Sequence, residues 1–427
     1  MPKWQWILLQ LTRRLWVRAA LIGLLGVCAA ALATLAETLA PWEPHFDISA
    51  EAVNSILSII ASSMLTVTTF SLSVMTSAYS STTSNATPRA TKLLIEDNMS
   101  QNVLSTFIGS FLFSIVGIVV LKTGAYGPQG RAVLFGVTIA VIALIVLSLL
   151  RWIDYLTQLG RVEKAAGRVE TATRKAVLAR LAQPCLGGQP LRRADGIPDD
   201  ALTIRSMETG YVQHIDMQRL SDCVEGRKAR LYLEAVPGNF VFLNAPLARL
   251  VLSESGTDEQ NGSAENQSEG LAEQVRAAIT IGQERSFDQD PRFGFCVLSE
   301  IATRALSPGI NDSGTAIDII GRITRLLSLW ADQDTRQEAE VTYPALYAPP
   351  IEARDLFDDG FNQIARDGAS HVEIHLRLRK SLAALSAIGD DVFQDAAREQ
   401  AALALKRADA ALGLAEDKLR LEAVPVN

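Results

Sequence analysis

The segment AVNSILSIIASSMLTVTTFSLSVMTSAYSSTTSNATP, from Ala52 to Pro88, contains no charged side chain. It is long enough to cross the hydrocarbon core of a bilayer, which takes about 20 helical residues. Hydroxyl groups recur along it at spacings of three and four, so in a helix they form one polar row, here called the hydroxyl stripe. The stripe consists of Ser55, Ser58, Ser62, Thr66, Thr69, Ser73, Thr76 and Ser80.

The opposite side of this segment is apolar, and we expect it to face lipid; it consists of Val53, Leu57, Ile60, Met64, Val67 and Met75. Hydroxyls in a membrane helix often bond the backbone one turn back while small residues pack closely, and they can also line a polar path. Both interpretations stay open. As a helix, residues 52–80 would be about 43 Å long, which exceeds the hydrocarbon core of about 30 Å.

Three further uncharged segments have the length of a membrane span: Ala19–Ala36, Asn98–Leu121 and Ala132–Leu150. The sequence therefore predicts four spans. Basic residues precede the first span, at positions 3, 13, 14 and 18, whereas only acidic residues follow it, at 37, 43, 47 and 51. Because basic residues stay on the inner side of a membrane, we expect both termini and everything after the fourth span to be cytoplasmic.

The sequence after the four predicted spans shows different residue patterns. Helical periodicity continues through Tyr155–Ala182, which we read as one long helix, and short alternating runs divided by Thr209-Gly210 and Pro237-Gly238 predict a small β module. The expected fold is thus a membrane α-helical domain of four transmembrane helices with a cytoplasmic α+β region that contains long amphipathic helices. The expected parts are a four-span domain at 1–153, a helix and linker at 154–200, the β module at 201–252, a flexible acidic loop at 253–270 and a helical domain at 271–427.

Composition limits the function classes. The chain has 20% charged residues and a net charge of -7, so no basic field suggests a nucleic-acid partner. Its four cysteines are scattered without a C-x-x-C pair, which predicts unpaired thiols. His371 and His375 are four residues apart, but they lack a third ligand and are expected at the surface. We find no nucleophile motif, phosphate loop or zinc spacing, and we therefore expect no enzyme activity, no cofactor and no metal.

Polar side chains are unusually dense between residues 285 and 312. Charges buried without partners cost several kcal/mol, so something must pair them. One interpretation is a site for an anion, a metal or a small ligand, formed by Arg285, Asp288, Asp290, Arg304, Asn311 and Asp312. The other is structural: Asp288 or Asp290 caps a helix that begins at Pro291, Asp312 or Ser313 caps the next helix, and the arginines pair with these acids.

Two phrases carry a family resemblance, ERSFDQDPRFGF at 284–295 and RALSPGINDSGTA at 304–316. Together with residues 69–77, Thr87-Pro88-Arg89 and residues 107–116, they resemble a bacterial family of predicted membrane proteins, the domain of unknown function 2254 family. The resemblance covers nearly the whole chain and implies a multi-pass protein of the bacterial inner membrane, but no activity. The family pattern Asn-Asp-Pro-Thr-Thr-Ala reads Asn-Asp-Ser-Gly-Thr-Ala at 311–316 here.

These observations favour a homo-oligomeric ion channel or small-solute conduit lined by the second span. The expected pore-lining residues are Ser58, Ser62, Thr66, Thr69, Ser73, Thr76 and Ser80. Four spans per chain seldom enclose a path alone, so we expect the chain to associate with copies of itself in the lipid bilayer and to pass ions. The alternative is a membrane-anchored sensor or scaffold whose cytoplasmic region binds a small anionic ligand or a partner.

Overall fold

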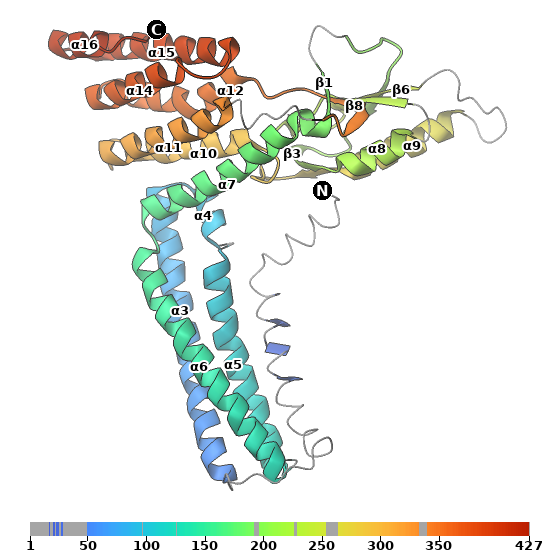
Figure 1. The fold of residues 1–427 in the computed structure, drawn as a ribbon, viewed down its shortest axis with the longest axis vertical. Coiled ribbons are helices and arrows are strands. Elements are labelled where there is room, and N and C mark those ends of the chain that lie inside the picture. The colour runs from blue at the N-terminus through green and yellow to red at the C-terminus, as the bar shows by residue number, and fades with distance from the viewer. Residues whose placement is uncertain are drawn as a thin grey trace. The chain divides into compact units, whose positions relative to one another are not determined.

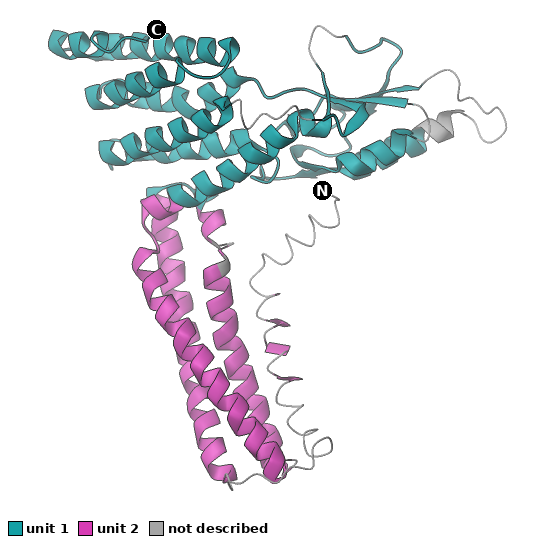
Figure 2. Cartoon of the chain, viewed as in Figure 1, with its two compact units in different colours: residues 1–6, 85–90, 166–427 teal, residues 7–84, 91–165 magenta. Residues whose placement is uncertain are grey.

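The computed structural model describes residues 17, 20, 21, 23, 24, 27, 28, 49–95, 97–124, 126–191, 196–225, 229–252, 264–332 and 340–426. The chain forms two compact units (Figure 2). In its described part, unit 1 comprises residues 85–90 and 166–426, and unit 2 comprises residues up to 84 together with 91–165. The short segment 85–90 therefore belongs to unit 1, although the residues on either side of it belong to unit 2.

Unit 2 is helical. Its described elements are α3 (Ala50–Asn85), α4 (Pro88–Ile95), α5 (Asn98–Lys122) and α6 (Pro128–Gln158), with α3, α5 and α6 side by side (Figure 1). Within the described residues, these three are long and apolar enough to cross a membrane. The third and fourth predicted spans fall within α5 and α6, and the second, Ala52–Pro88, extends three residues beyond the end of α3. The first, Ala19–Ala36, lies largely outside the described residues.

The apolar side of α3 packs against protein, so the expectation that it faces lipid is wrong. Val53 and Leu57 are buried in a cluster with Phe113 of α5 and Leu134 of α6. Ile60, Met64 and Met75 are buried in a second cluster with side chains of the same two helices. Apolar side chains are removed from solvent on this side because α3 has neighbours there, whereas the hydroxyl stripe is exposed in the described part of the chain.

The predicted continuous helix Tyr155–Ala182 is also wrong, because the chain breaks after Gln158. Gly160 has a φ of +86°, in the left-handed region that a helix of L-residues avoids and that glycine tolerates. A second helix, α7 (Val162–Ala182), then begins. Sequence periodicity missed the break because the helical spacing of apolar residues continues across Leu159-Gly160-Arg161, from one helix into the next.

Two sheets and two helices form one part of unit 1. One sheet has the strand order β1-β8-β4-β6-β2, with β8 parallel to both β1 and β4 and the remaining pairs antiparallel; the other is an antiparallel sheet of order β5-β3-β7. The strands are β1 (Gly188–Pro190), β2 (Leu202–Arg205), β3 (Gly210–Ile215), β4 (Ala229–Leu233), β5 (Phe240–Val241), β6 (Pro246–Leu252), β7 (Ile279–Gly282) and β8 (Tyr343–Ala348). Helices α8 (Met217–Glu225) and α9 (Ala264–Ala278) share their apolar core.

This β module differs from the predicted one in extent. Strands β1, β7 and β8 lie outside residues 201–252, because pairing joins segments far apart in the chain. Part of the predicted loop at 253–270 is also helical, since α9 begins at Ala264, while residues 253–263 lie outside the described part.

The rest of unit 1 is a stack of helices. Its core is built from fully buried side chains such as Phe295, Phe361 and Phe393. The elements are η1 (Pro184–Gly187), α10 (Pro291–Ala305), α11 (Ser313–Ala331), α12 (Ala353–Phe357), η5 (Asp358–Asn362), α13 (Gln363–Asp367), α14 (Val372–Leu385), α15 (Asp391–Ala411) and α16 (Ala415–Glu422), with η1 leading out of α7. Helix α11 packs against α10 and α14, and α14 packs against α15 (Figure 1).

Candidate functional site

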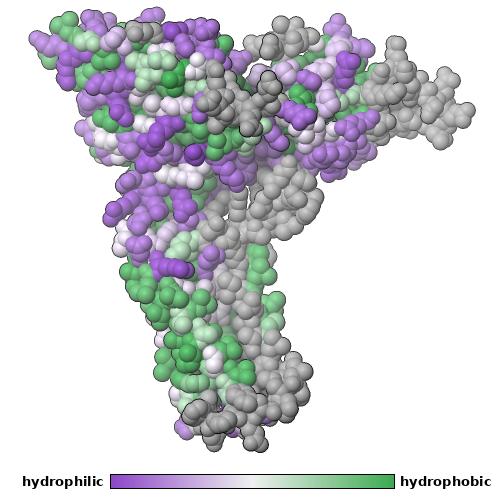
Figure 3. Space-filling model, viewed as in Figure 1, coloured by the Kyte–Doolittle hydropathy of each residue, from purple (hydrophilic) through white to green (hydrophobic). Residues whose placement is uncertain are grey.

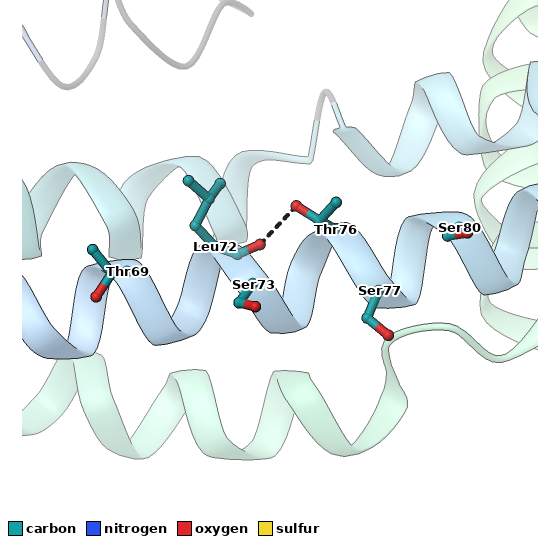
Figure 4. Close-up of a pocket in the computed structure, with 6 residues that line it drawn as sticks. All are labelled: Thr69, Leu72, Ser73, Thr76, Ser77 and Ser80. Carbon is teal, nitrogen blue, oxygen red and sulfur yellow. Dashed lines mark hydrogen bonds between the residues drawn. The ribbon is translucent and has the colours of Figure 1, made fainter.

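The hydroxyl stripe lies on the free side of α3. All seven predicted pore-lining side chains, from Ser58 to Ser80, are exposed in the described part of the chain. A shallow hollow of about 560 Å³ lies along the second half of the stripe, and Figure 4 shows the six residues that line it, Thr69, Leu72, Ser73, Thr76, Ser77 and Ser80.

Several hydroxyls of the stripe donate to the backbone of α3 itself. The Oγ of Ser62 lies 3.0 Å from the carbonyl oxygen of Ser58, and that of Thr66 lies 2.9 Å from the carbonyl oxygen of Ser62. Thr76 donates in the same way to Leu72, at 2.9 Å (Figure 4). The hydrogens of these hydroxyls are therefore used within the helix, and their oxygen lone pairs remain available on the outer side.

The free sides of α3 and α6 differ in chemistry. Helix α6 exposes aliphatic side chains, namely Ile139, Leu144, Val146, Leu147, Leu150 and Ile153. Helix α3 exposes its hydroxyls together with two narrow apolar rows beside them, one containing Leu65 and Leu72 and the other Ile59 and Phe70. Hydrophobic residues are gathered on unit 2 in Figure 3 as well, as expected of helices that meet lipid.

The second candidate site begins at the start of α10. Asp290 caps this helix by accepting a hydrogen bond from the backbone N–H of Phe293 at 3.2 Å, and its other carboxylate oxygen accepts one from Nε of Arg285 at 2.8 Å. Burial alone would lower the pKa of Arg285, but the charge and hydrogen bond of Asp290 outweigh it and raise that pKa above its ordinary value. Both groups are thus used in an ion pair between a half-buried guanidinium and a buried carboxylate.

A second guanidinium, that of Arg180, is buried near the same carboxylate. Burial lowers the pKa of Arg180 to about 10, and the charge of Asp290 partly offsets this. Arg180 donates to the backbone carbonyl of Gln289 at 2.8 Å, and the side chain of Gln289 in turn bonds the backbone N–H and carbonyl of Ile215 in β3. Asp288, also predicted for the site, contacts Ser286 in the same turn. These bonds join α7, β3 and α10.

The remaining predicted ligand residues lie at the other end of α10 or just beyond it. Arg304 is exposed in its last turn. Asp312 caps α11 by accepting from the backbone N–H of Thr315 at 3.0 Å, and hydrogen bonds from the hydroxyl and backbone of Thr315 lower its pKa. Asn311, at a φ of +51°, lies 3.3 Å from Nε2 of His371 through its side-chain oxygen.

The predicted ligand-binding residues therefore fall into two groups, one at each end of α10. A helix of 15 residues is about 22 Å long, so Arg285 and Asp290 do not share a small ligand with Asn311 and Asp312. The capping interpretation is confirmed for Asp290 and Asp312. The arginines pair only partly as expected, since Arg292 binds Asp355 and Asp359 at 2.5 and 2.6 Å instead of a neighbouring acid.

Sequence reasoning missed one contact on α10. The carboxylate of Glu300 accepts a hydrogen bond from the Thr87 hydroxyl at 2.9 Å and forms an ion pair with Arg89. Thr87-Pro88-Arg89 carries part of the family resemblance and so could have drawn attention to this contact. The sequence does not show the partner, however, because Glu300 is more than 200 positions away. His375 is also misplaced by the sequence, because it is buried in α14 and not at the surface.

Comparison with known proteins identifies the family. A family model described as "Predicted membrane protein (DUF2254)" matches residues 12–384. The chain belongs to this family. It is also similar to the uncharacterized proteins Mb1321c of Mycobacterium bovis and Rv1290c of Mycobacterium tuberculosis, with 23% identity over 285 residues, 65% of this chain and 52% of either relative. The chain thus matches about half the length of these relatives, and no solved structure matches it.

Proposed function

We propose that this member of the DUF2254 family is a homo-oligomeric conduit for ions or small solutes, in which the hydroxyl side of α3 from several copies lines the path. The protein would lie in the bacterial inner membrane with four spans and with both termini and unit 1 in the cytoplasm. The basic residues before the first predicted span and after the fourth support this orientation.

The contrast between the free sides of α3 and α6 carries the proposal. Two candidate spans of the same unit leave one side uncovered by described residues, and only α3 places a continuous row of hydroxyls there. Hydroxyls bonded to their own helix are tolerated in lipid, so one or two would need no explanation. A row from Ser58 to Ser80 covers six helical turns and suits a polar path better than lipid.

The rows beside the stripe support an oligomer. Leu65 and Leu72 lie along one edge of the hydroxyls, and Ile59 and Phe70 along the other. If several copies surround an axis, these apolar edges pack between neighbouring copies while the hydroxyls between them face the axis. A symmetric ring of this kind uses the same two edges of every copy.

The hydrogen bonds of the stripe favour cations over anions. Because Ser62, Thr66, Thr69 and Thr76 donate their hydroxyl hydrogens to backbone carbonyls of α3, the wall presents oxygen lone pairs. No charged side chain between residues 52 and 88 would bind a cation tightly and stop its passage.

Purified protein in planar bilayers or potassium-loaded vesicles tests this function. We expect wild-type protein to pass current that favours cations, measured as a reversal potential in a salt gradient. The triple variant T66L/T69L/S73L should lose this current, because it replaces the polar wall over two turns with aliphatic side chains.

A neighbouring pair of serines supplies the matched control. Ser62 lies on the stripe and Ser63 lies beside it, and both are exposed. Ser62→Leu should reduce the current, whereas Ser63→Leu should leave it near the wild-type level. Silent wild-type protein, or a triple variant that conducts like wild type, would show that α3 lines no conduit.

A further inference from the structure

Glu300 holds the connection between two candidate spans inside unit 1. Residues 85–90, here called the strap, join the end of α3 to the start of α4 and belong to unit 1. Ala86, Thr87 and Ala90 of the strap are buried. One carboxylate oxygen of Glu300 accepts from the Thr87 hydroxyl at 2.9 Å, and the other pairs with the guanidinium of Arg89.

The two partners differ in how firmly they are held. Glu300 belongs to α10, a helix whose Phe295, Val297 and Ile301 are fully buried and whose first turn is fixed by Asp290. Arg89 has 56% of its side chain exposed, against 25% for Glu300. Attraction between such accessible charges weakens as salt is added, because the screening length falls from about 10 Å at 0.1 M to about 3 Å at 1 M.

We propose that the strap is a salt-sensitive latch: Glu300 helps to keep the strap bound to α10 at low ionic strength, and rising ionic strength makes its release more frequent. Since the chain is continuous on both sides of the strap, release frees the end of α3 and the start of α4. The consequence for conduction rests on the proposed function, in which α3 lines the path and a freed α3 changes the current. The latch itself does not require conduction.

Hydrogen–deuterium exchange of the full-length protein in nanodiscs tests the latch directly. In wild type, we expect the peptide that contains residues 85–90 to exchange faster in 0.5 M than in 0.05 M salt, by between about 1.4-fold and five-fold, the range for an exposed ion pair. Glu300→Gln should exchange fast at both salt concentrations. Arg89→Gln should also exchange fast at both salt concentrations. Because Arg89 is largely exposed, this second variant leaves the core of α10 intact.

The charge-exchanged variant R89E/E300R should recover part of the protection at low salt. Glu399→Gln, which removes another exposed ion pair of unit 1, with Arg354, is the matched control and should leave the strap unchanged. Equal salt dependence in wild type and Glu300→Gln, or an unaltered strap in Arg89→Gln, would overturn the proposal. A protein with a working latch but no current would contradict the proposed conduit alone.

Discussion

His375 lies in α14 with 2% of its surface exposed, and its Nε2 atom has no hydrogen-bond partner among the described residues. Burial lowers the pKa of His375 from 6.5 to about 4, and the charges of Arg407 and His371 act in the same direction. Between these two values the unfolded chain binds a proton that the folded chain does not. Stability therefore falls as the pH drops below about 6.5, and the loss is complete below about 4.

We expect acid to lower the stability of the folded protein, and substitution of His375 to reduce this effect. Relative to pH 7, wild-type protein at pH 5 should lose about 2 kcal/mol of unfolding free energy through this residue, from the two pKa values. His375→Leu should show a flatter dependence of the melting temperature on pH in detergent solution. An unchanged slope in His375→Leu would contradict the assignment.

Two helix caps and His375 show which features of single residues could be predicted from the sequence. The helix caps at Asp290 and Asp312 were predictable, because a cap depends on an acid directly before a helical run such as the one at Pro291. The burial of His375 was not, since it depends on α15 and α16 covering that side of α14, and a spacing of four residues does not reveal a neighbour far along the chain.

Helices α7 and α10 cross at Gly294, where an added methyl group has no room. A Cβ atom there would lie 1.8 Å from Oγ1 and 2.6 Å from Cβ of Thr173, whose side chain is buried. Gly294→Ala should therefore force the helices apart and lower the unfolding free energy by about 1–3 kcal/mol, the usual cost of overpacking. Thermal unfolding of the purified protein measures this, with Gly309→Ala, which meets nothing within 4 Å, as the control.

A melting temperature equal to that of wild type in Gly294→Ala would mean that α7 does not pack on α10 as described.

Among the secondary-structure elements, the sequence predicted helices better than sheets. The uncharged runs placed α3, α5 and α6, because a span needs only length and apolar composition. Strand β8 was missed, since it joins β4 and β1 from about 115 to 158 residues away in the chain and carries no local turn signal.

For the whole molecule, sequence and family agree on a membrane protein. Most of the described residues lie outside its three apolar helices. What the sequence misjudged was the orientation of α3. Periodicity separates an apolar side from a hydroxyl side, but it does not say which side has neighbours. Packing against α5 and α6 buries the apolar side, and this reversal makes the hydroxyl stripe the surface available to another copy of the chain.

The last prediction tests that surface in the whole assembly. In a background with the exposed Cys28 changed to alanine, Ser73→Cys should form cross-linked dimers in native membranes with a short bifunctional thiol reagent, because the proposed oligomer would bring this position of neighbouring copies close to its axis. Leu147→Cys on the exposed aliphatic side of α6 is the control and should stay monomeric, since the proposed arrangement would leave it in lipid. Cross-linking at Leu147 but not at Ser73 would place α6 at the contact between copies and α3 in lipid, against the proposed arrangement. Equal failure at both positions, with a single-chain mass by light scattering in detergent, would exclude the oligomer and the conduit with it.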